Sequence, residues 1–347
     1  MPMEAATAKL APPRASTFED SEWHALSRFW HPVAFSAGVR DKPVAAKLLD
    51  EKLVVFRTSA GITVARDLCL HRGARLSLGE MDGDQLVCGF HGFHYNRFGH
   101  CTLIPAHPGI AIPSKLCLRT FTCAERYGLV WVCLAGDAAA PLPDWPELEG
   151  GAYELIPMEP IDWNSSAGRH TENFQDVAHL SWVHTGTFGH RETPEVIRYP
   201  VDEDEHRLSI VIPEANQHDR DVHGKRPDTI CKVRYLQSID IPFASRLLVD
   251  YFEGRHLLYF DVAAPVSVDS CRIFVIMGRN FGFEDPPRAL IDYNLAVLAE
   301  DRPFVESQCP QDLPLDLHDE VHIPADLLSI RYREKLRELG LGEKFFA

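Results

Sequence analysis

Residues 69–95 read CLHRGARLSLGEMDGDQLVCGFHGFHY and contain two pairs of cysteine and histidine. Cys69 and His71 form a Cys-x-His pair, and after 16 intervening residues Cys88 and His91 form a Cys-x-x-His pair. Two thiolates together with two imidazoles suit either a zinc ion or an iron–sulfur cluster. Because a turn and a strand are predicted between the pairs, the second loop can fold back over the first. The stretch therefore predicts a metal site built by two neighbouring loops.

The composition of the two pairs favours a cluster over a structural zinc ion. Each pair contributes one cysteine and one histidine, so two similar loops can clamp opposite sides of a Rieske [2Fe–2S] cluster, in which one iron takes two cysteines and the other two histidines. Glycines follow both histidines, at Gly73 and Gly92, and without a Cβ they let backbone N–H groups approach the sulfurs. We interpret the four residues as ligands of such a cluster, with structural zinc as the alternative.

The composition of the whole chain limits the possible functions. The chain has 347 residues, enough for two domains with separate cores. A formal net charge of −15 disfavours nucleic acid and anionic lipid as partners. No segment approaches the roughly 20 apolar residues that span a bilayer, and the N-terminus lacks the apolar core of a signal peptide. We expect a cytoplasmic protein without membrane contact, whose nine cysteines are reduced thiols or metal ligands.

The chain is predicted to be an α+β protein with four regions. They are a disordered lead-in at residues 1–22, an all-β cluster domain at 23–135, a linker at 136–160 and a catalytic domain at 161–347. Short apolar runs broken by turn residues predict the all-β domain, and a stretch rich in Pro, Ala and Gly predicts the linker. The last region is expected to form an antiparallel sheet flanked by helices, with strands at 206–212, 229–241, 246–252, 255–264 and 271–280 and helices at 287–308 and 325–339.

A second group of potential ligands lies in ENFQDVAHLSWVH, residues 172–184. His179 and His184 are five residues apart, so on a regular helix their side chains would point about 140° apart. A helix that ends or bulges between them could bring both to one metal. Two imidazoles with one carboxylate form the site of non-haem Fe(II) oxygenases. By themselves these histidines would be ordinary surface or core residues, but the predicted cluster upstream makes coincidence the weaker explanation.

Together the two motifs resemble those of the Rieske non-haem iron oxygenases. In that family the second site has the pattern Asp-x-x-His-x-x-x-x-His, which Asp176, His179 and His184 match. The resemblance implies a mononuclear Fe(II) held by the two histidines, and a catalytic domain of the helix-grip type. It also implies that Asp176 orients His179 and accepts a hydrogen bond from a cluster histidine, matching His91, of a neighbouring subunit. Asn173 matches a family asparagine near the iron, with a purely structural amide as an equal alternative.

The third iron ligand is implied by a late segment, LAEDRPFVESQ at residues 298–308. It is similar to the family's helix whose aspartate completes the iron site, and Asp301 is the matching position. Glu300 is adjacent, but on a helix it is expected to point about 100° away. Glu306 is a weaker rival for the ligand position.

The cluster loops resemble the oxygenase branch more than the respiratory Rieske proteins. Respiratory members carry an extra cysteine in each loop, where this chain has Ala74 and Phe90. They also have a hydroxyl side chain soon after the second histidine, where this chain has Phe93. A missing hydrogen bond to sulfur is expected to lower the reduction potential of the cluster.

The resemblance covers nearly the whole chain and is greatest to the branch with methylxanthine N-demethylases and related N- or O-demethylating oxygenases. It implies the terminal oxygenase of a multicomponent monooxygenase. Electrons from NADH or NADPH would come through a reductase, with or without a separate ferredoxin, and O2 would be the co-substrate. We expect a homotrimer that demethylates a small aromatic or heteroaromatic molecule.

Three alternatives remain at this stage. Within the enzyme class, the chain could be a ring-dihydroxylating or ring-hydroxylating dioxygenase, which would yield a cis-diol. From other classes, it could be a Rieske electron carrier with a redundant second domain, or a binding protein stapled by zinc.

Overall fold

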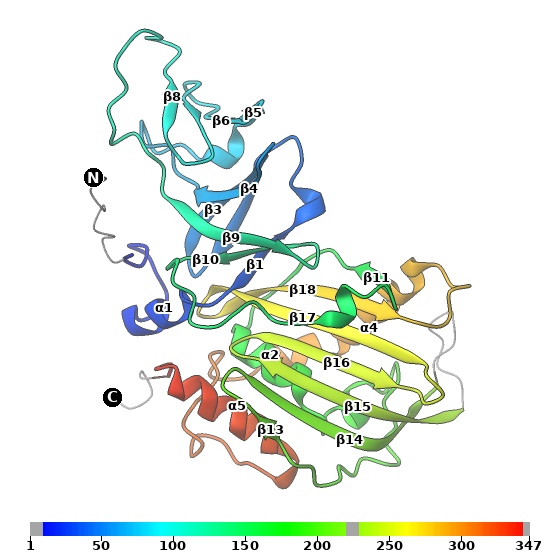
Figure 1. Cartoon of the computed structure of the whole chain (residues 1–347). Helices are drawn as coiled ribbons and strands as arrows, with labels where there is room; N and C mark the ends of the chain where they lie inside the picture. The colour runs from blue at the N-terminus through cyan, green and yellow to red at the C-terminus, as the bar shows by residue number, and fades with distance from the viewer. Residues whose placement is uncertain (1–9, 220–228, 343–347) are drawn as a thin grey trace. The chain divides into compact units, whose positions relative to one another are not determined.

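The computed structural model describes residues 10–219 and 229–342, and the chain divides into two compact units, Met1–Leu142 and Pro143–Ala347 (Figure 1). Each unit has its own sheets and buried apolar residues. Within the described ranges, no helix combines the length and the apolar character that crossing a membrane requires.

A six-stranded antiparallel sheet forms the base of the first unit, as far as the described residues show, with strand order β1-β10-β9-β4-β3-β2. The β9–β10 hairpin turns through Tyr127 and Gly128, both at positive φ (58° and 72°), which suits the right-handed twist of paired strands. The elements are helix α1 (Asp20–Leu26) and strands β1 (His31–Phe35), β2 (Val44–Leu48), β3 (Glu51–Thr58), β4 (Gly61–Arg66), β9 (Thr120–Arg126) and β10 (Leu129–Cys133).

A smaller four-stranded sheet, order β5-β6-β7-β8, is inserted in the chain between β4 and β9. Phe56, Leu86 and Tyr95 belong to one buried hydrophobic cluster that also contains Cys69 and Cys88. Because these side chains pack together, the two cysteine loops are held next to each other. The strands of this sheet are β5 (Glu80–Asp82), β6 (Gln85–Val87), β7 (His94–Tyr95) and β8 (Cys101–Leu103), preceded by the 3₁₀ turn η2 (Leu76–Leu78).

The second unit contains an antiparallel sheet, described with eight strands in the order β11-β18-β17-β16-β15-β14-β13 and with β12 paired to β18. Successive hairpins join its long central strands. The strands are β11 (Glu154–Pro157), β12 (Ile161–Trp163), β13 (Asp202–Glu203), β14 (Arg207–His218), β15 (Ile230–Asp240), β16 (Ala244–Asp250), β17 (His256–Ser267) and β18 (Ser270–Arg279).

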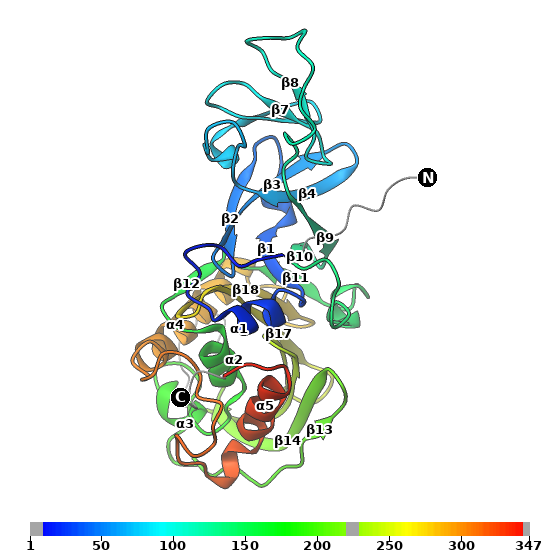
Figure 2. The ribbon, with the colours of Figure 1, turned by 90° about the vertical axis from the view of Figure 1, so that its left-hand side faces the viewer.

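The helices of the second unit lie on one face of this sheet (Figure 2). Helix α2 packs on strands β15 to β18, and the Ser166 side chain caps its first turn by accepting a 3.1 Å hydrogen bond from the Arg169 N–H. The buried Arg333 of α5 pairs with Glu172 of α2 at 2.6 Å, which fixes α2 from its other side. The helices are α2 (Ala167–Gln175), α3 (Leu180–Val183), α4 (Pro287–Val305) and α5 (Leu327–Glu338).

The predicted catalytic-domain strands and late helices are all present, but two junctions differ from the prediction. Strand β11 lies inside the predicted linker 136–160 and pairs with β18, so the second unit begins earlier than residue 161. Prolines and glycines on both sides concealed this short strand. Helix α1 begins at Asp20, inside the predicted lead-in 1–22, because Trp23 is fully buried and donates to the Leu49 carbonyl. Residues 1–9 of that lead-in are outside the described residues.

Candidate metal centres

The two loops predicted to hold a cluster have the same backbone hydrogen bonds. In the first loop the Cys69 N–H donates to the Ala74 carbonyl at 2.8 Å, and in the second the Cys88 N–H donates to the Phe93 carbonyl at 2.9 Å. Each cysteine carbonyl accepts from the glycine four residues later, Gly73 or Gly92. Both glycines have positive φ, 72° and 68°, a conformation that costs residues with a Cβ about 1–2 kcal/mol. The glycines are therefore required by the turn.

The side chains of these loops separate into a buried sulfur side and an exposed imidazole side. Cys69 and Cys88 are 2% and 1% exposed, whereas His71 and His91 are exposed and their ring centroids lie 4.6 Å apart. Burial raises the pKa of the Cys88 thiol, so a bound cation is needed to keep the thiolate there. Paired buried sulfurs and paired imidazoles fit the two irons of a Rieske cluster.

A hydroxyl group lies next to one of the two cysteine sulfurs, from a residue that the sequence analysis did not consider. The hydroxyl of Tyr95, on strand β7, lies 3.3 Å from Cys69 Sγ. Phe93, the position at which the missing hydroxyl was noted, instead stacks on the His71 ring at 4.6 Å. The Tyr95 contact is therefore separate from the hydroxyl that is missing at residue 93, and the effect of that missing hydroxyl on the reduction potential stays a prediction. Tyr95 belongs to the same buried hydrophobic cluster as Cys69, a contact that the two-residue strand β7 does not reveal in the sequence.

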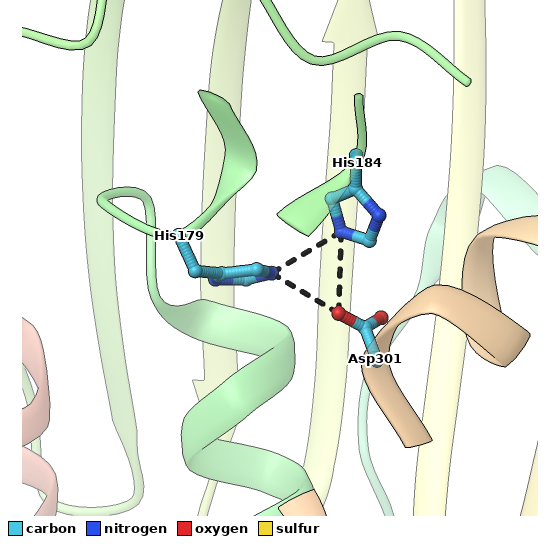
Figure 3. A group of neighbouring side chains, drawn as sticks. All are labelled: His179, His184 and Asp301. Atoms are coloured by element: carbon cyan, nitrogen blue, oxygen red, sulfur yellow. Dashed lines mark hydrogen bonds and ion pairs between the residues drawn. The ribbon is translucent and has the colours of Figure 1, made fainter. Parts of the chain in front are cut away.

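His179, His184 and Asp301 meet in the second unit, as predicted (Figure 3). Their ligand atoms all lie within 4.8 Å of one another, and the two Nε2 atoms are 3.4 and 3.3 Å from Asp301 Oδ1. Asp301 is 6% exposed, and its Oδ1 pairs with both imidazoles. A buried carboxylate oxygen that faces two imidazole nitrogens fits a metal ion bound by two histidines and one carboxylate.

The helix break that this geometry needs lies between α2 and α3. Helix α2 ends at Gln175, and α3 is only four residues long, with His179 at its N-cap and His184 at its C-cap. Because the backbone leaves helical geometry at His184 (φ −87°, ψ 32°), the imidazoles are freed from the 140° separation of a regular helix. Asp301 arrives from α4, which packs against α2.

A carboxylate holds the outer ring nitrogen of each histidine. Asp176 Oδ2 lies 3.2 Å from His179 Nδ1, as the sequence analysis expected for this residue. Glu300 Oε2 lies 3.1 Å from His184 Nδ1 and accepts from the Thr187 hydroxyl at 2.7 Å. Such partners fix the tautomer and direction of a ligating imidazole.

Glu300 is the site residue that the sequence analysis missed, because its direction away from Asp301 was taken to exclude it. The two adjacent carboxylates of α4 contact different atoms of the site: Asp301 faces the Nε2 atoms of both histidines, and Glu300 contacts Nδ1 of His184. Glu306, the weaker rival, accepts a hydrogen bond from the Asn164 N–H and pairs with Arg302, so it is occupied elsewhere.

Hydrogen bonding changes the acidity of these groups. Burial lowers the pKa of His179, but its bonds to Asp176 and Asp301 outweigh burial and raise that pKa to about 9. Burial acts to raise the pKa of Glu300, but hydrogen bonds from His184 and Thr187 hold it below its usual value.

A cavity opens on the three candidate ligands, and concave, largely apolar sites of this kind bind small organic molecules. Its lining is mostly apolar and aromatic and comes from strands β14 to β18 and helices α2 to α4. Asn173 of α2 is among the lining residues. Polar lining residues from the sheet include Gln217, Tyr235, Gln237 and Asp261.

Comparisons with known proteins agree with both centres. The Rieske [2Fe-2S] domain family matches residues 29–121, and the family described as vanillate O-demethylase oxygenase C-terminal domain matches residues 163–341. Over 327 residues the chain is 35% identical to methylxanthine N1-demethylase NdmA of Pseudomonas putida, covering 92% of this chain and 90% of NdmA. Over 336 residues it is 30% identical to the N3-demethylase NdmB of the same organism, covering 91% and 90%.

Solved structures give the same result. Pseudomonas putida NdmA with caffeine matches with a TM-score of 0.82 at 34% identity, over 94% of each chain. Dicamba monooxygenase bound to dicamba matches with a TM-score of 0.76 at 20% identity, over 90% of this chain and 97% of the other, and shares the fold.

A Rieske domain followed by a domain with two histidines and one carboxylate at one site defines the class of Rieske non-haem iron oxygenases. This chain belongs to that class, in the family with the vanillate O-demethylase type of C-terminal domain. Its cofactors are a Rieske [2Fe–2S] cluster and a mononuclear non-haem iron. It is the oxygenase component of a multicomponent system that needs a reductase and O2. The predicted fold class, enzyme class and cofactors are confirmed.

Proposed function

We propose that this chain removes a methyl group from the nitrogen or oxygen of a small aromatic or heteroaromatic molecule. The observation that carries this proposal is the largely apolar cavity that opens on His179, His184 and Asp301. Relatives named as methylxanthine N-demethylases and vanillate O-demethylases support a methyl group as the site of attack.

The ligands are proposed as follows. Two buried thiolates and two exposed imidazoles hold the cluster, and a triad at the cavity wall holds the iron, with Asp301 as its only carboxylate. The cluster ligands are Cys69, His71, Cys88 and His91, and the iron ligands are His179, His184 and Asp301.

When bound, the iron supplies oxygen activation with electrons from the cluster. The residues of the chain do the rest: Asp176 and Glu300 hold the two imidazoles in position, and the apolar lining excludes water from the methyl carbon. Asn173 is proposed to orient a polar group near the iron. In the net reaction O2, two electrons and two protons turn a methyl C–H into C–OH and release one water. The resulting hemiaminal or hemiacetal then splits into formaldehyde and the demethylated product.

A homotrimer is proposed as the working assembly, with NADH or NADPH as the electron source through a reductase. Large apolar side chains are exposed beside the cluster histidines, including Leu70 (41%), Leu78 (78%) and Phe90 (63%). Trp182, between the two iron histidines, is also exposed (57%). Exposed apolar groups next to redox sites favour burial against another subunit. In this arrangement Asp176 accepts a hydrogen bond from His91 of a neighbouring copy and so links cluster to iron.

The test is anaerobic purification with metal and sulfide analysis, followed by a screen of N- and O-methylated aromatics for O2 uptake. We expect about three irons and two sulfides per chain, and one formaldehyde for each O2 consumed with an accepted substrate. A cis-diol product without formaldehyde would replace demethylation with ring dihydroxylation. Zinc in place of iron would overturn the whole proposal, and an accepted methyl substrate that yields neither product would overturn demethylation.

A further inference from the structure

The cavity floor contains a buried acid that the iron site does not use. Asp261, on β17, lines the same cavity as the iron triad and is 1% exposed. One of its oxygens, Oδ1, lies 2.8 Å from Nε2 of the buried His170 on α2. The other oxygen, Oδ2, has no hydrogen-bond partner. A buried carboxylate oxygen without a partner is unfavourable by itself, so the site is incomplete without a donor.

The strand register places this acid among other cavity residues. Gln237, Leu247 and Tyr259 lie side by side on β15, β16 and β17, and Asp261 follows two residues after Tyr259. Because side chains two apart on a strand share a face, Asp261 and Gln237 are on the same side of the sheet. Both line the cavity, and Oε1 of Gln237, a residue 3% exposed, also has no partner.

The polar group next to them is already satisfied, and this contrast is informative. Gln217 accepts from the Tyr235 hydroxyl at 2.8 Å and donates to the Tyr251 hydroxyl at 3.0 Å. Its amide is therefore occupied at both ends within the protein. Asp261 and Gln237 each keep one acceptor oxygen unused. This part of the cavity therefore presents two free hydrogen-bond acceptors, Asp261 Oδ2 and Gln237 Oε1, to a donor group on the substrate.

The charge of the cavity excludes one class of substrate. Among its described lining residues there is no Lys or Arg, while two are acidic, Asp261 and Asp301. Beside Asp261, a carboxylate or sulfonate of the substrate would have no Lys or Arg partner and would lie close to an anionic side chain, which is costly. An N–H group, neutral or cationic, would complete the buried acid.

We propose that Asp261, held by His170, anchors the substrate by accepting a hydrogen bond from a substrate N–H, so that the enzyme takes N–H-bearing nitrogen compounds and rejects carboxylates. This inference rests on the proposed function, because it assigns the substrate-binding end of the same cavity. Asp261 is a specificity residue, and the methyl group to be oxidised points from this anchor toward the iron triad.

The test measures equilibrium binding of small probe molecules to the anaerobic holoenzyme by calorimetry. The probes differ in whether they carry an N–H group or a carboxylate. N-methylbenzimidazolone keeps one ring N–H, and N,N′-dimethylbenzimidazolone has none. N,N-dimethylbenzylammonium carries a cationic N–H, while para-methoxytoluene and para-methoxybenzoate compare a neutral ring with its carboxylate. We expect an N–H probe to bind about tenfold more tightly than its partner without N–H, and the benzoate to bind more weakly than the toluene.

Two variants sharpen the result. Asp261→Asn keeps the shape but replaces one acceptor oxygen by an N–H donor, so the N–H preference should vanish. Asp240→Asn is the matched control, because Asp240 is a carboxylate of the same sheet that is bound by Arg207 and Trp145 and does not line the cavity. It should leave the preference unchanged. If N-methylbenzimidazolone binds more tightly than its dimethyl analogue, the preferred substrate group is a neutral N–H donor. If the benzylammonium binds more tightly than para-methoxytoluene, the preferred group is a cationic N–H donor.

Equal binding of both benzimidazolones, with the benzylammonium no tighter than para-methoxytoluene, would overturn the proposal and leave Asp261 as a structural partner of His170. So would para-methoxybenzoate binding more tightly than para-methoxytoluene. The wild-type preferences decide the question even if Asp261→Asn does not fold. Because binding is measured without turnover, this result is separate from the formaldehyde test of the proposed function.

Discussion

The two candidate metal centres are built in opposite ways. All four proposed cluster ligands lie between residues 69 and 91, on two loops with identical backbone hydrogen bonds and a positive-φ glycine each. The iron triad combines two histidines at the ends of the short helix α3 with Asp301 of α4, more than a hundred residues later. The cluster site is therefore shaped mainly by local backbone conformation. The iron site is shaped by packing between helices and by carboxylates that hold the histidines.

The largest expected effect comes from removing the distant ligand. Asp301→Ala should remove the mononuclear iron, because two histidines alone leave the site without its carboxylate. Substrate-dependent O2 uptake should fall to background. The visible absorption of the cluster should be unchanged, since its ligands belong to the other unit. Loss of both iron centres together would contradict the separation of the two sites.

Next is the carboxylate behind His184. Glu300→Gln keeps the size of the side chain but weakens its grip on His184 Nδ1 and on Thr187. We expect iron affinity or turnover to fall by about 10–100-fold, the usual cost of losing such a partner. The loss of iron affinity is measured as the fraction of iron that the protein retains during dialysis against a chelator. Asp292→Asn, an exposed acid on the same helix that pairs with Arg288, serves as the control and should retain iron like the wild type.

A smaller effect should follow from a local change at the cluster. Gly92→Ala forces a Cβ into a φ of 68° and to 3.0 Å from Pro105 Cγ. The cost should be about 1–2 kcal/mol, seen as reduced cluster content and a lower unfolding temperature of the first unit. Gly109→Ala is the matched control, because its added Cβ meets no atom within 4 Å and its φ is not in the positive range. Equal effects of the two substitutions would show that the glycine turn is not required.

The smallest effect concerns the tyrosine beside the cluster sulfur. Tyr95→Phe removes the hydroxyl 3.3 Å from Cys69 Sγ while keeping the buried ring. A hydrogen bond worth about 1.4 kcal/mol corresponds to about 60 mV for a one-electron couple, and its loss should lower the reduction potential. Potentiometric titration followed by visible absorption measures the change. An unchanged potential would mean that this hydroxyl does not stabilise the reduced cluster.

The same contrast explains which features could be predicted. The cluster motif is contiguous, so its proposed ligands, its glycines and its turn could all be predicted from one short stretch of sequence. Asp301 was found through the resemblance, since composition could not choose one among 50 acidic residues. Glu300 was excluded as an iron ligand because it points about 100° away from Asp301 on the helix. In the structure the loop after α3 contacts that side of α4, where Gly186 and Thr187 donate hydrogen bonds to Glu300. Strand β11 was concealed because it is short and is flanked by prolines and glycines, and its pairing with β18 became visible only in the structure.

By itself, the sequence determined the paired cysteine and histidine loops and the strands and helices of the second half, because each depends on spacing or periodicity over a few residues, while the class of oxygenase came from the resemblance to a known family. Only the tertiary structure revealed the partners that hold these ligands, Glu300 and Tyr95, and the buried acid Asp261 in the cavity floor. The physical reason is that burial and hydrogen-bond partners arise from segments packed together in space, and one strand or helix does not specify which distant side chain will face it.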